Sequence, residues 1–348
     1  MSGHIILVFV IIAFLALLNK KWGLLVSFAL LIWMLSFRTN EIPDTEIYQW
    51  MYDDPISRLD YNEIGFLFLG IGFKMVTGAE FIVFYLSLVG VCLALWYFGS
   101  KKILPDDEHF GMLFLIFLSF FGFFYLGITI RNCLSEVLIL CGLGFFLRLK
   151  GWKRIFFYLL FVVLAMFIHR SAAFFLLLLP LIRVKISTSG YYRIFALCVI
   201  LWLLSGSALS RGIVGEISKL SMFSKLDNYS SSAESAPSML SLQILINWIV
   251  SYFAIRSQNS IETKYRSIYN YFLKINMMGL FTLSVIWSVP TSYRFYNMFF
   301  FFNFILIYLI IFHNNRITKK KSKSIYSLSI SAAYFAILLH SFSFLLLY

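Results

Sequence analysis

The chain has 348 residues, of which 61% are hydrophobic and only 13% are charged, and 40 of them are phenylalanine. This composition excludes a soluble globular domain and is typical of an all-α protein that crosses a membrane many times. A net charge of +13 would also fit a nucleic-acid-binding protein. The positive residues are scattered between apolar stretches, however, so membrane topology explains them better. We expect a single integral membrane domain over residues 1–348. It should contact the lipid bilayer and bind no nucleic acid.

About 12 apolar stretches are candidate membrane helices. They cover residues 4–18, 22–37, 80–98, 110–128, 132–147, 155–168, 171–182, 191–209, 240–255, 267–288, 295–313 and 325–347. If the N-terminus lies outside, roughly twice as many lysines and arginines fall in cytoplasmic loops as in outer loops, which is the expected asymmetry. The four cysteines lie inside these stretches without paired or metal-type spacing, so we predict no disulfide and no metal site.

Two outer segments stand apart from the candidate spans. The apolar run at 64–76 is short and contains three glycines and Lys74. If this run crossed the membrane, every later loop would change sides, and the distribution of lysine and arginine between the two sides would be reversed. We therefore predict a re-entrant or interfacial helix within a first outer loop at 38–79. The serine-rich segment 210–238 is predicted to be a flexible outer loop.

An ionisable pair, His169 and Arg170, interrupts the long apolar region between two basic clusters. Ionisable residues at membrane depth are costly and usually mark a functional site. If both basic clusters are cytoplasmic, the chain rises to this pair and returns, with each arm shorter than the hydrocarbon core is thick. The alternative is a single crossing over residues 155–180 that carries a buried histidine.

Isolated polar residues at the outer ends of the spans predict a cavity that faces outward. Such a cavity excludes ATP and nucleotide sugars as direct substrates, and the sequence contains no phosphate-binding glycine-rich loop. Guanidinium groups bind phosphate oxygens through paired hydrogen bonds, so a lipid diphosphate fits this rim. The predicted diphosphate-binding residues are Arg38, Arg131, Arg170 and Arg294. Arg38, Arg131 and Arg294 could instead be anchors whose side chains extend toward the membrane surface.

His169 is the predicted general base, because the imidazole pKa lies near neutrality. Asp44 and Glu63 lie at the two ends of the first outer loop and could assist it, or could be ordinary solvated carboxylates. Tyr48 and Tyr293 are predicted to contact sugar rings. Aromatic residues are also common at membrane interfaces in general.

Several short motifs, in this order, resemble the EpsG family of bacterial polysaccharide polymerases, a branch of the Wzy-type enzymes. They are Phe37-Arg38, Asp44, Tyr48, Glu63-Ile64-Gly65-Phe66, Ile130-Arg131-Asn132-Cys133-Leu134, Phe167-Ile168-His169-Arg170-Ser171-Ala172 and Tyr293-Arg294-Phe295-Tyr296. The resemblance implies an enzyme of the bacterial inner membrane that joins oligosaccharide repeats carried on undecaprenyl diphosphate into O-antigen or capsule. It also implies a site facing the periplasm or outside, no cofactor, and a protein partner that regulates chain length.

Three other functions remain open from the residues themselves. Asp53 and Asp54 could form the acidic pair of a metal-dependent lipid-phosphosugar transferase. An integral-membrane O-acyltransferase is a second alternative. A flippase for lipid-linked oligosaccharides is the third, although a flippase should line a path through the whole bilayer with charge, and the inner half-spans contain few charges besides Glu136 and Lys274.

Overall fold

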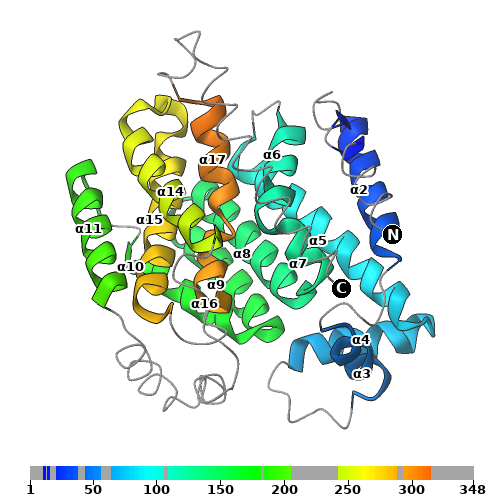
Figure 1. Cartoon of the computed structure of the whole chain (residues 1–348). Helices are drawn as coiled ribbons and strands as arrows, with labels where there is room; N and C mark the ends of the chain where they lie inside the picture. Colours follow the sequence, from blue (N-terminus) through cyan, green and yellow to red (C-terminus); the bar gives the residue numbers. More distant parts are fainter. Residues whose placement is uncertain are drawn as a thin grey trace. The chain divides into compact units, whose positions relative to one another are not determined.

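The computed structural model describes residues 11–12, 14–15, 21–37, 44–55, 64–105, 109–181, 184–204, 242–287 and 293–314. Within these ranges the elements are helices, joined by short turns and by one isolated antiparallel β-bridge between Ile261 and Asn314. The predicted all-α class is therefore confirmed for the described part of the chain (Figure 1).

The described residues form two compact units, one that ends at Leu176 and one that begins at Leu177. The first unit contains α2 (Lys21–Leu35), α3 (Thr45–Asp53), α4 (Ile64–Thr77), α5 (Phe81–Ile103), α6 (Phe110–Phe117), the π-helix η2 (Leu118–Gly122), α7 (Phe123–Gly127), α8 (Ile130–Arg148), α9 (Gly151–Ile168) and nearly all of the 3-10 helix η3 (Arg170–Leu177). The second contains α10 (Leu178–Leu181), α11 (Thr188–Leu204), α14 (Leu242–Ser257), the 3-10 helix η5 (Gln258–Ser260), α15 (Thr263–Ile286), α16 (Tyr293–Phe300) and α17 (Asn303–Phe312).

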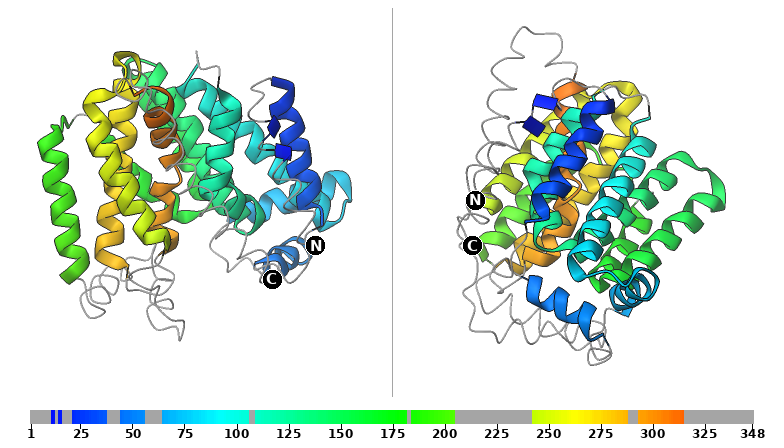
Figure 2. Two further views of the ribbon diagram at one scale, coloured as in Figure 1. Left: turned by 45° about the horizontal axis from the view of Figure 1, so that its top comes forward. Right: turned by 90° about the vertical axis from the view of Figure 1, so that its right-hand side faces the viewer.

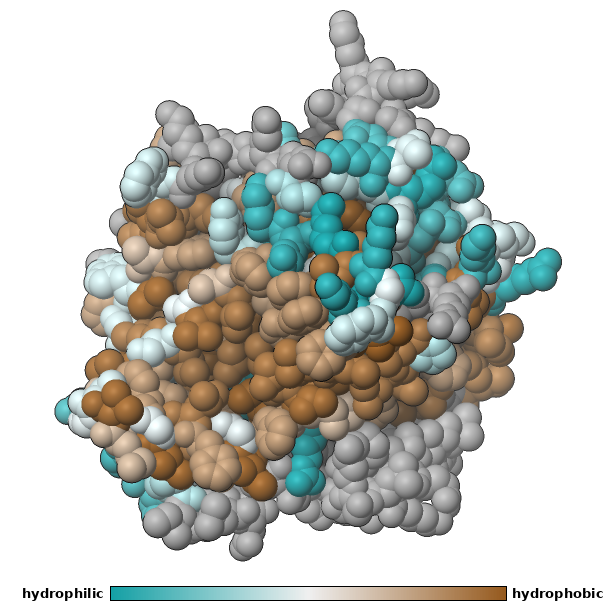
Figure 3. Space-filling view, turned by 180° about the vertical axis from the view of Figure 1, so that it is seen from behind, coloured by the Kyte–Doolittle hydropathy of each residue, from teal (hydrophilic) through white to brown (hydrophobic). Residues whose placement is uncertain are grey.

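Four segments within the described ranges are long and apolar enough to cross a membrane: Phe81–Ile103, Ile130–Arg148, Gly151–Ile168 and Phe295–Phe312. Shorter apolar helices accompany them at Trp22–Leu35, Ile64–Thr77, Arg170–Pro180 and Thr188–Leu204. Many large side chains on these helices are exposed and hydrophobic, among them Phe68, Val76, Phe167 and Leu204. On the face drawn in Figure 3, hydrophobic side chains cover most of the described surface. The chain is thus a helical membrane protein, and the number of spans expected beyond these four stays a prediction.

In the first unit, α8 packs against both α5 and α9. The helices α5 and α8 run parallel: Tyr85 Oη donates to the Leu126 carbonyl just before α8, and at the other end Arg148 Nε donates to the Lys102 carbonyl over 2.7 Å. Gly99 permits this close packing, because a Cβ there would lie 2.9 Å from Leu140 Cγ. A tight turn then makes α9 antiparallel to α8, as the views of Figure 2 also show.

In the second unit, α15 packs against α11, α14, α16 and α17. Tyr269 Oη donates to the Ala254 carbonyl over 2.6 Å, which joins α15 to the antiparallel α14. Asn276 Nδ2 donates to Asn303 Oδ1 over 2.9 Å, which joins α15 to α17. The long helix α15 therefore forms the centre of this unit.

Candidate active site in the first unit

The chain reverses direction at His169. The helix α9 ends at Ile168, and His169 is extended, with φ −150° and ψ 116°. The Tyr158 hydroxyl, in α9, donates to the Phe175 carbonyl of η3 over 2.7 Å. A continuous helix would separate these residues by about 25 Å, so the segment after His169 returns along α9. A single helix over 155–180, the alternative left open by the sequence, does not form.

Arg131 and His169 lie at the same end of the antiparallel α8–α9 hairpin. Ser135 lies one turn after Arg131 in α8, and Ala165 lies one turn before His169 in α9. Ser135 Oγ donates to the Ala165 carbonyl over 3.4 Å. The Ala165 carbonyl also accepts from the His169 backbone N–H over 2.8 Å. At the opposite end of α8, Arg148 meets Lys102 in the last turn of the neighbouring helix α5. The hairpin thus brings a guanidinium and an imidazole to one end and places a basic cluster at the other.

The Arg131 guanidinium lies against aromatic rings from the first outer loop. Its Cζ is 4.8 Å from the centre of the Tyr48 ring and 5.7 Å from that of Phe66. Met51 Sδ lies 4.0 Å from Arg131 Nη1. A cation over a ring face is attracted by the electrons of the ring. Two rings and a sulfur therefore surround the guanidinium, and the sulfur accepts from one of its N–H groups.

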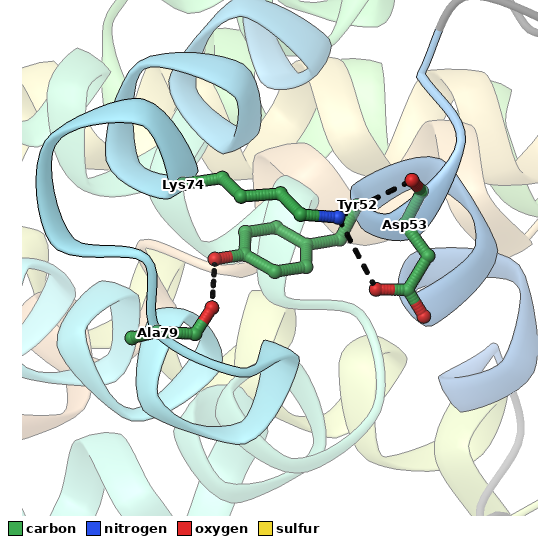
Figure 4. Close-up of polar contacts among 4 residues, drawn as sticks. All are labelled: Tyr52, Asp53, Lys74 and Ala79. Atoms are coloured by element: carbon green, nitrogen blue, oxygen red, sulfur yellow. Dashed lines mark hydrogen bonds and ion pairs between the residues drawn. The ribbon is translucent and has the colours of Figure 1, made fainter.

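The helix that carries Tyr48 is fixed to its neighbours by polar contacts (Figure 4). Tyr52 Oη donates to the Ala79 carbonyl over 2.6 Å. Lys74 Nζ lies 3.7 Å from Asp53 Oδ1, donates to the Asp53 carbonyl over 3.3 Å, and lies over the Tyr52 ring. Burial raises the pKa of the Tyr52 phenol, and the nearby Asp53 carboxylate raises it further. The α3 helix is therefore joined both to α4 and to the start of α5.

Close backbone packing brings α4 to the end of α9. A Cβ on Gly65 would lie 2.5 Å from the Phe167 carbonyl oxygen, closer than any real contact permits. Gly65 is thus required where α4 meets the chain two residues before His169. With 14 residues, α4 spans about 21 Å, which is shorter than the hydrocarbon core.

Asp44 begins α3 in a left-handed backbone conformation, with φ 64° and ψ −5°. Its carbonyl accepts from the Tyr48 backbone N–H over 3.0 Å, so Asp44 fixes the first turn of the helix that carries Tyr48. Non-glycine residues rarely take this conformation, although aspartate tolerates it better than most. Strained residues of this kind are concentrated at functional sites.

The remaining predicted site residues are distributed as follows. Arg170 is half-buried and begins η3, next to His169. Arg294 and Tyr293 begin α16, in the second unit. Arg38, Glu63 and the loop 210–238 lie outside the described residues. The structure therefore brings Tyr48, Asp44, Arg131, His169 and Arg170 into one unit, and their roles stay predictions.

Sequence reasoning assigned Tyr48 to sugar binding and did not single out Phe66 or Met51. The Tyr48 ring is 1% exposed, and its observed neighbours are Arg131 and Phe66, 5.6 Å away. A sugar could stack on this ring only after α3 moved. An available signal was the helical spacing of Tyr48 and Met51, which places them on one face of a short helix.

The amino-acid sequence matches a known protein family. The model of the EpsG family matches residues 21–348. No curated protein and no solved structure matches the chain. The family match covers nearly the whole length, includes every predicted site residue, and suggests a membrane protein of the polysaccharide-polymerase type. The protein is a member of the EpsG family.

Proposed function

We propose that this protein is a membrane glycosyltransferase that joins oligosaccharide repeats carried on undecaprenyl diphosphate into a longer polysaccharide, O-antigen or capsule. The observation that supports this most directly is the location of Arg131 and His169 at one end of the α8–α9 hairpin, opposite the basic end at Lys102 and Arg148. Positive residues favour the cytoplasmic side of a membrane. The Arg131 end then faces the periplasm or outside, and the inner membrane of a bacterium is the proposed location.

Arg131 is the proposed ligand of the donor diphosphate. It is the second residue of α8, so the positive end of the helix dipole adds to its own charge. The rings of Tyr48 and Phe66 contact the guanidinium. Its N–H groups are proposed to bind the phosphate oxygens in pairs. Arg38 and Arg170 are proposed as further contacts to the same anion, and Arg294, in the second unit, as a separate diphosphate-binding residue.

His169 is the proposed general base of a glycosyl transfer. The acceptor hydroxyl oxygen attacks the anomeric carbon of the donor sugar, and a ring nitrogen of His169 takes the hydroxyl proton. The bond from the anomeric carbon to the diphosphate oxygen breaks, and the electron pair leaves with the lipid diphosphate. Arginines stabilise the charge that builds on this leaving group. Asp44 and Glu63 are proposed to orient the acceptor or share the base role, and Tyr293 to contact sugar.

The proposal implies two kinds of partner. The substrates are glycans linked to undecaprenyl diphosphate, which stay in the bilayer while their sugar ends meet at the outer face. A protein that regulates chain length is the proposed second partner, because the number of repeats has to be set by something other than the joining step.

The test uses a strain in which the wild-type protein is deleted and the His169→Ala variant is expressed at normal level. The measurement is the length distribution of its surface glycan. We expect single repeats in place of long chains. His109→Ala is the matched control, because His109 precedes α6 at the end of the unit where α5 finishes, and it should leave long chains. Long chains of normal distribution with His169→Ala would remove His169 from the mechanism. Repeats retained inside the cell would indicate a flippase instead.

A further inference from the structure

Three asparagines are buried in the apolar interior of the second unit. Asn247 in α14, Asn276 in α15 and Asn303 at the start of α17 are 1%, 0% and 1% exposed. A buried amide is costly in an apolar environment unless its hydrogen bonds are made. At membrane depth the neighbouring lipid offers no partner for it.

The three side chains lie at the same level of this unit. Asn276 and Asn303 are hydrogen-bonded to each other over 2.9 Å. The Tyr269 hydroxyl meets the Ala254 carbonyl in the antiparallel pair α14–α15. Asn247 lies about two turns before Ala254, and Asn276 about two turns after Tyr269, so the pairing brings Asn247 and Asn276 level. The helices α14, α15 and α17 are in mutual contact.

Four amide atoms of this trio have no hydrogen-bond partner among the described residues. They are Asn247 Nδ2, Asn247 Oδ1, Asn276 Oδ1 and Asn303 Nδ2. Two of them are donors and two are acceptors, and none carries a charge. If the oxygen and nitrogen of both Asn276 and Asn303 were assigned the other way round, the trio would still offer two donors and two acceptors. The set therefore suits a neutral molecule that donates and accepts hydrogen bonds, and it offers no charge to an ion.

The cluster lies where the last described span is interrupted. The helix α16 ends at Phe300 and α17 begins at Asn303. In the turn between them, Phe302 N–H bonds to the Phe299 carbonyl over 3.4 Å, and Ile305 N–H bonds to the Phe302 carbonyl over 3.1 Å. Gly279 permits α15 to approach this break, because a Cβ there would lie 2.9 Å from Phe299 Cβ. Breaks in membrane helices persist where polar groups or water satisfy the backbone.

We propose that Asn247, Asn276 and Asn303 form a buried site for enclosed water beside the break between α16 and α17. Water both donates and accepts hydrogen bonds, so it matches the balance of two donors and two acceptors, and buried water typically bonds to such otherwise unsatisfied groups. The bound water joins α14 to the bonded pair on α15 and α17, so three helices are held together at mid-span without a direct contact between every pair of amides.

The first test is the sign of a stability change in the full-length protein in nanodiscs. Asn247→Leu replaces the amide with an apolar group of similar size. If water bridges Asn247 to the other two amides, this substitution removes those bonds and lowers the thermal unfolding midpoint by roughly 2–4 °C. If the site is dry, it removes two unpaired polar atoms from the interior and raises the midpoint. A raised or unchanged midpoint would overturn the proposal. Ser251→Ala is the control, because its hydroxyl bonds to the Asn247 carbonyl in the same helix.

The second test detects the enclosed water by its chemistry. X-ray irradiation forms hydroxyl radicals from bound water, and these label nearby side chains. Met277 is buried and follows Asn276, so we expect it to be labelled in the wild-type protein and to lose most of that label in Asn247→Leu. Met34, buried in α2, is the reference for a methionine away from the site. Labelling of Met277 no stronger than that of Met34 would contradict enclosed water.

Discussion

The Arg131 guanidinium carbon lies 4.8 Å from the centre of the Tyr48 ring, so a short helix of the first outer loop holds the charged side chain in the first turn of α8. Phe66 and Met51 complete the contact. The two rings and the sulfur thus hold the guanidinium against α3 and α4, and an anion is proposed to bind at its N–H groups.

Replacing the Tyr48 ring tests this role. Tyr48→Leu removes the ring face, and a cation–π contact of about 0.5–2 kcal/mol corresponds to a roughly 2- to 30-fold lower rate of repeat joining. Tyr48→Phe keeps the ring and should retain most of the activity. The measurement is glycan chain length at matched protein level. If Tyr48→Phe were as damaging as Tyr48→Leu, the hydroxyl group would be the important feature, as the sugar-binding interpretation requires.

Gly65 and Gly72, two of the three glycines of α4, offer a matched pair of substitutions. Gly65→Ala introduces a Cβ 2.5 Å from the Phe167 carbonyl oxygen, so it should displace α4 from the end of α9 and lower the thermal unfolding midpoint. Gly72→Ala meets nothing within 4 Å and should stabilise the helix by about 0.5–1 kcal/mol. Equal midpoints for the two variants would show that α4 does not pack on Phe167.

Asp44 can be tested for charge and for backbone conformation separately. Asp44→Asn removes the charge but keeps a side chain that tolerates a positive φ, so the unfolding midpoint should stay unchanged while repeat joining falls. Asp44→Gly also adopts this φ without strain, and should keep α3 folded. Full activity in both variants would assign Asp44 a purely structural role.

One hydrogen bond that spans the reversal at His169 can be removed by a single substitution. Tyr158→Phe removes the hydroxyl that donates to the Phe175 carbonyl, and the loss of one such bond costs about 0.5–1.5 kcal/mol. We expect a lower unfolding midpoint and faster proteolysis near Ser171. Tyr97→Phe, on α5, is the control, because the observed contact of Tyr97 is between its ring and Phe110, 5.7 Å away.

The reversal itself could be predicted from the sequence, because a charged pair in an apolar region with basic residues on both sides leaves few topologies. The same charge pattern also predicts that Arg131 lies at the end of the hairpin opposite the basic cluster. The contact between Gly65 and Phe167 could not be predicted, since it depends on how two distant segments pack. The contact between Tyr48 and Arg131 could not be predicted either, because an aromatic residue in an outer loop can pack equally well on a sugar, a lipid or a cation.

The winding of the segment after His169 has a geometric consequence. A 3-10 helix advances about 2.0 Å per residue and an α-helix 1.5 Å, so the eight residues of η3 cover about 16 Å, where an α-helix would cover about 12 Å. The π-helix η2, between α6 and α7, has the opposite effect and shortens its stretch of chain. Two departures from regular winding, with opposite signs, therefore change the length that a given number of residues covers, one by extending the chain and one by compressing it.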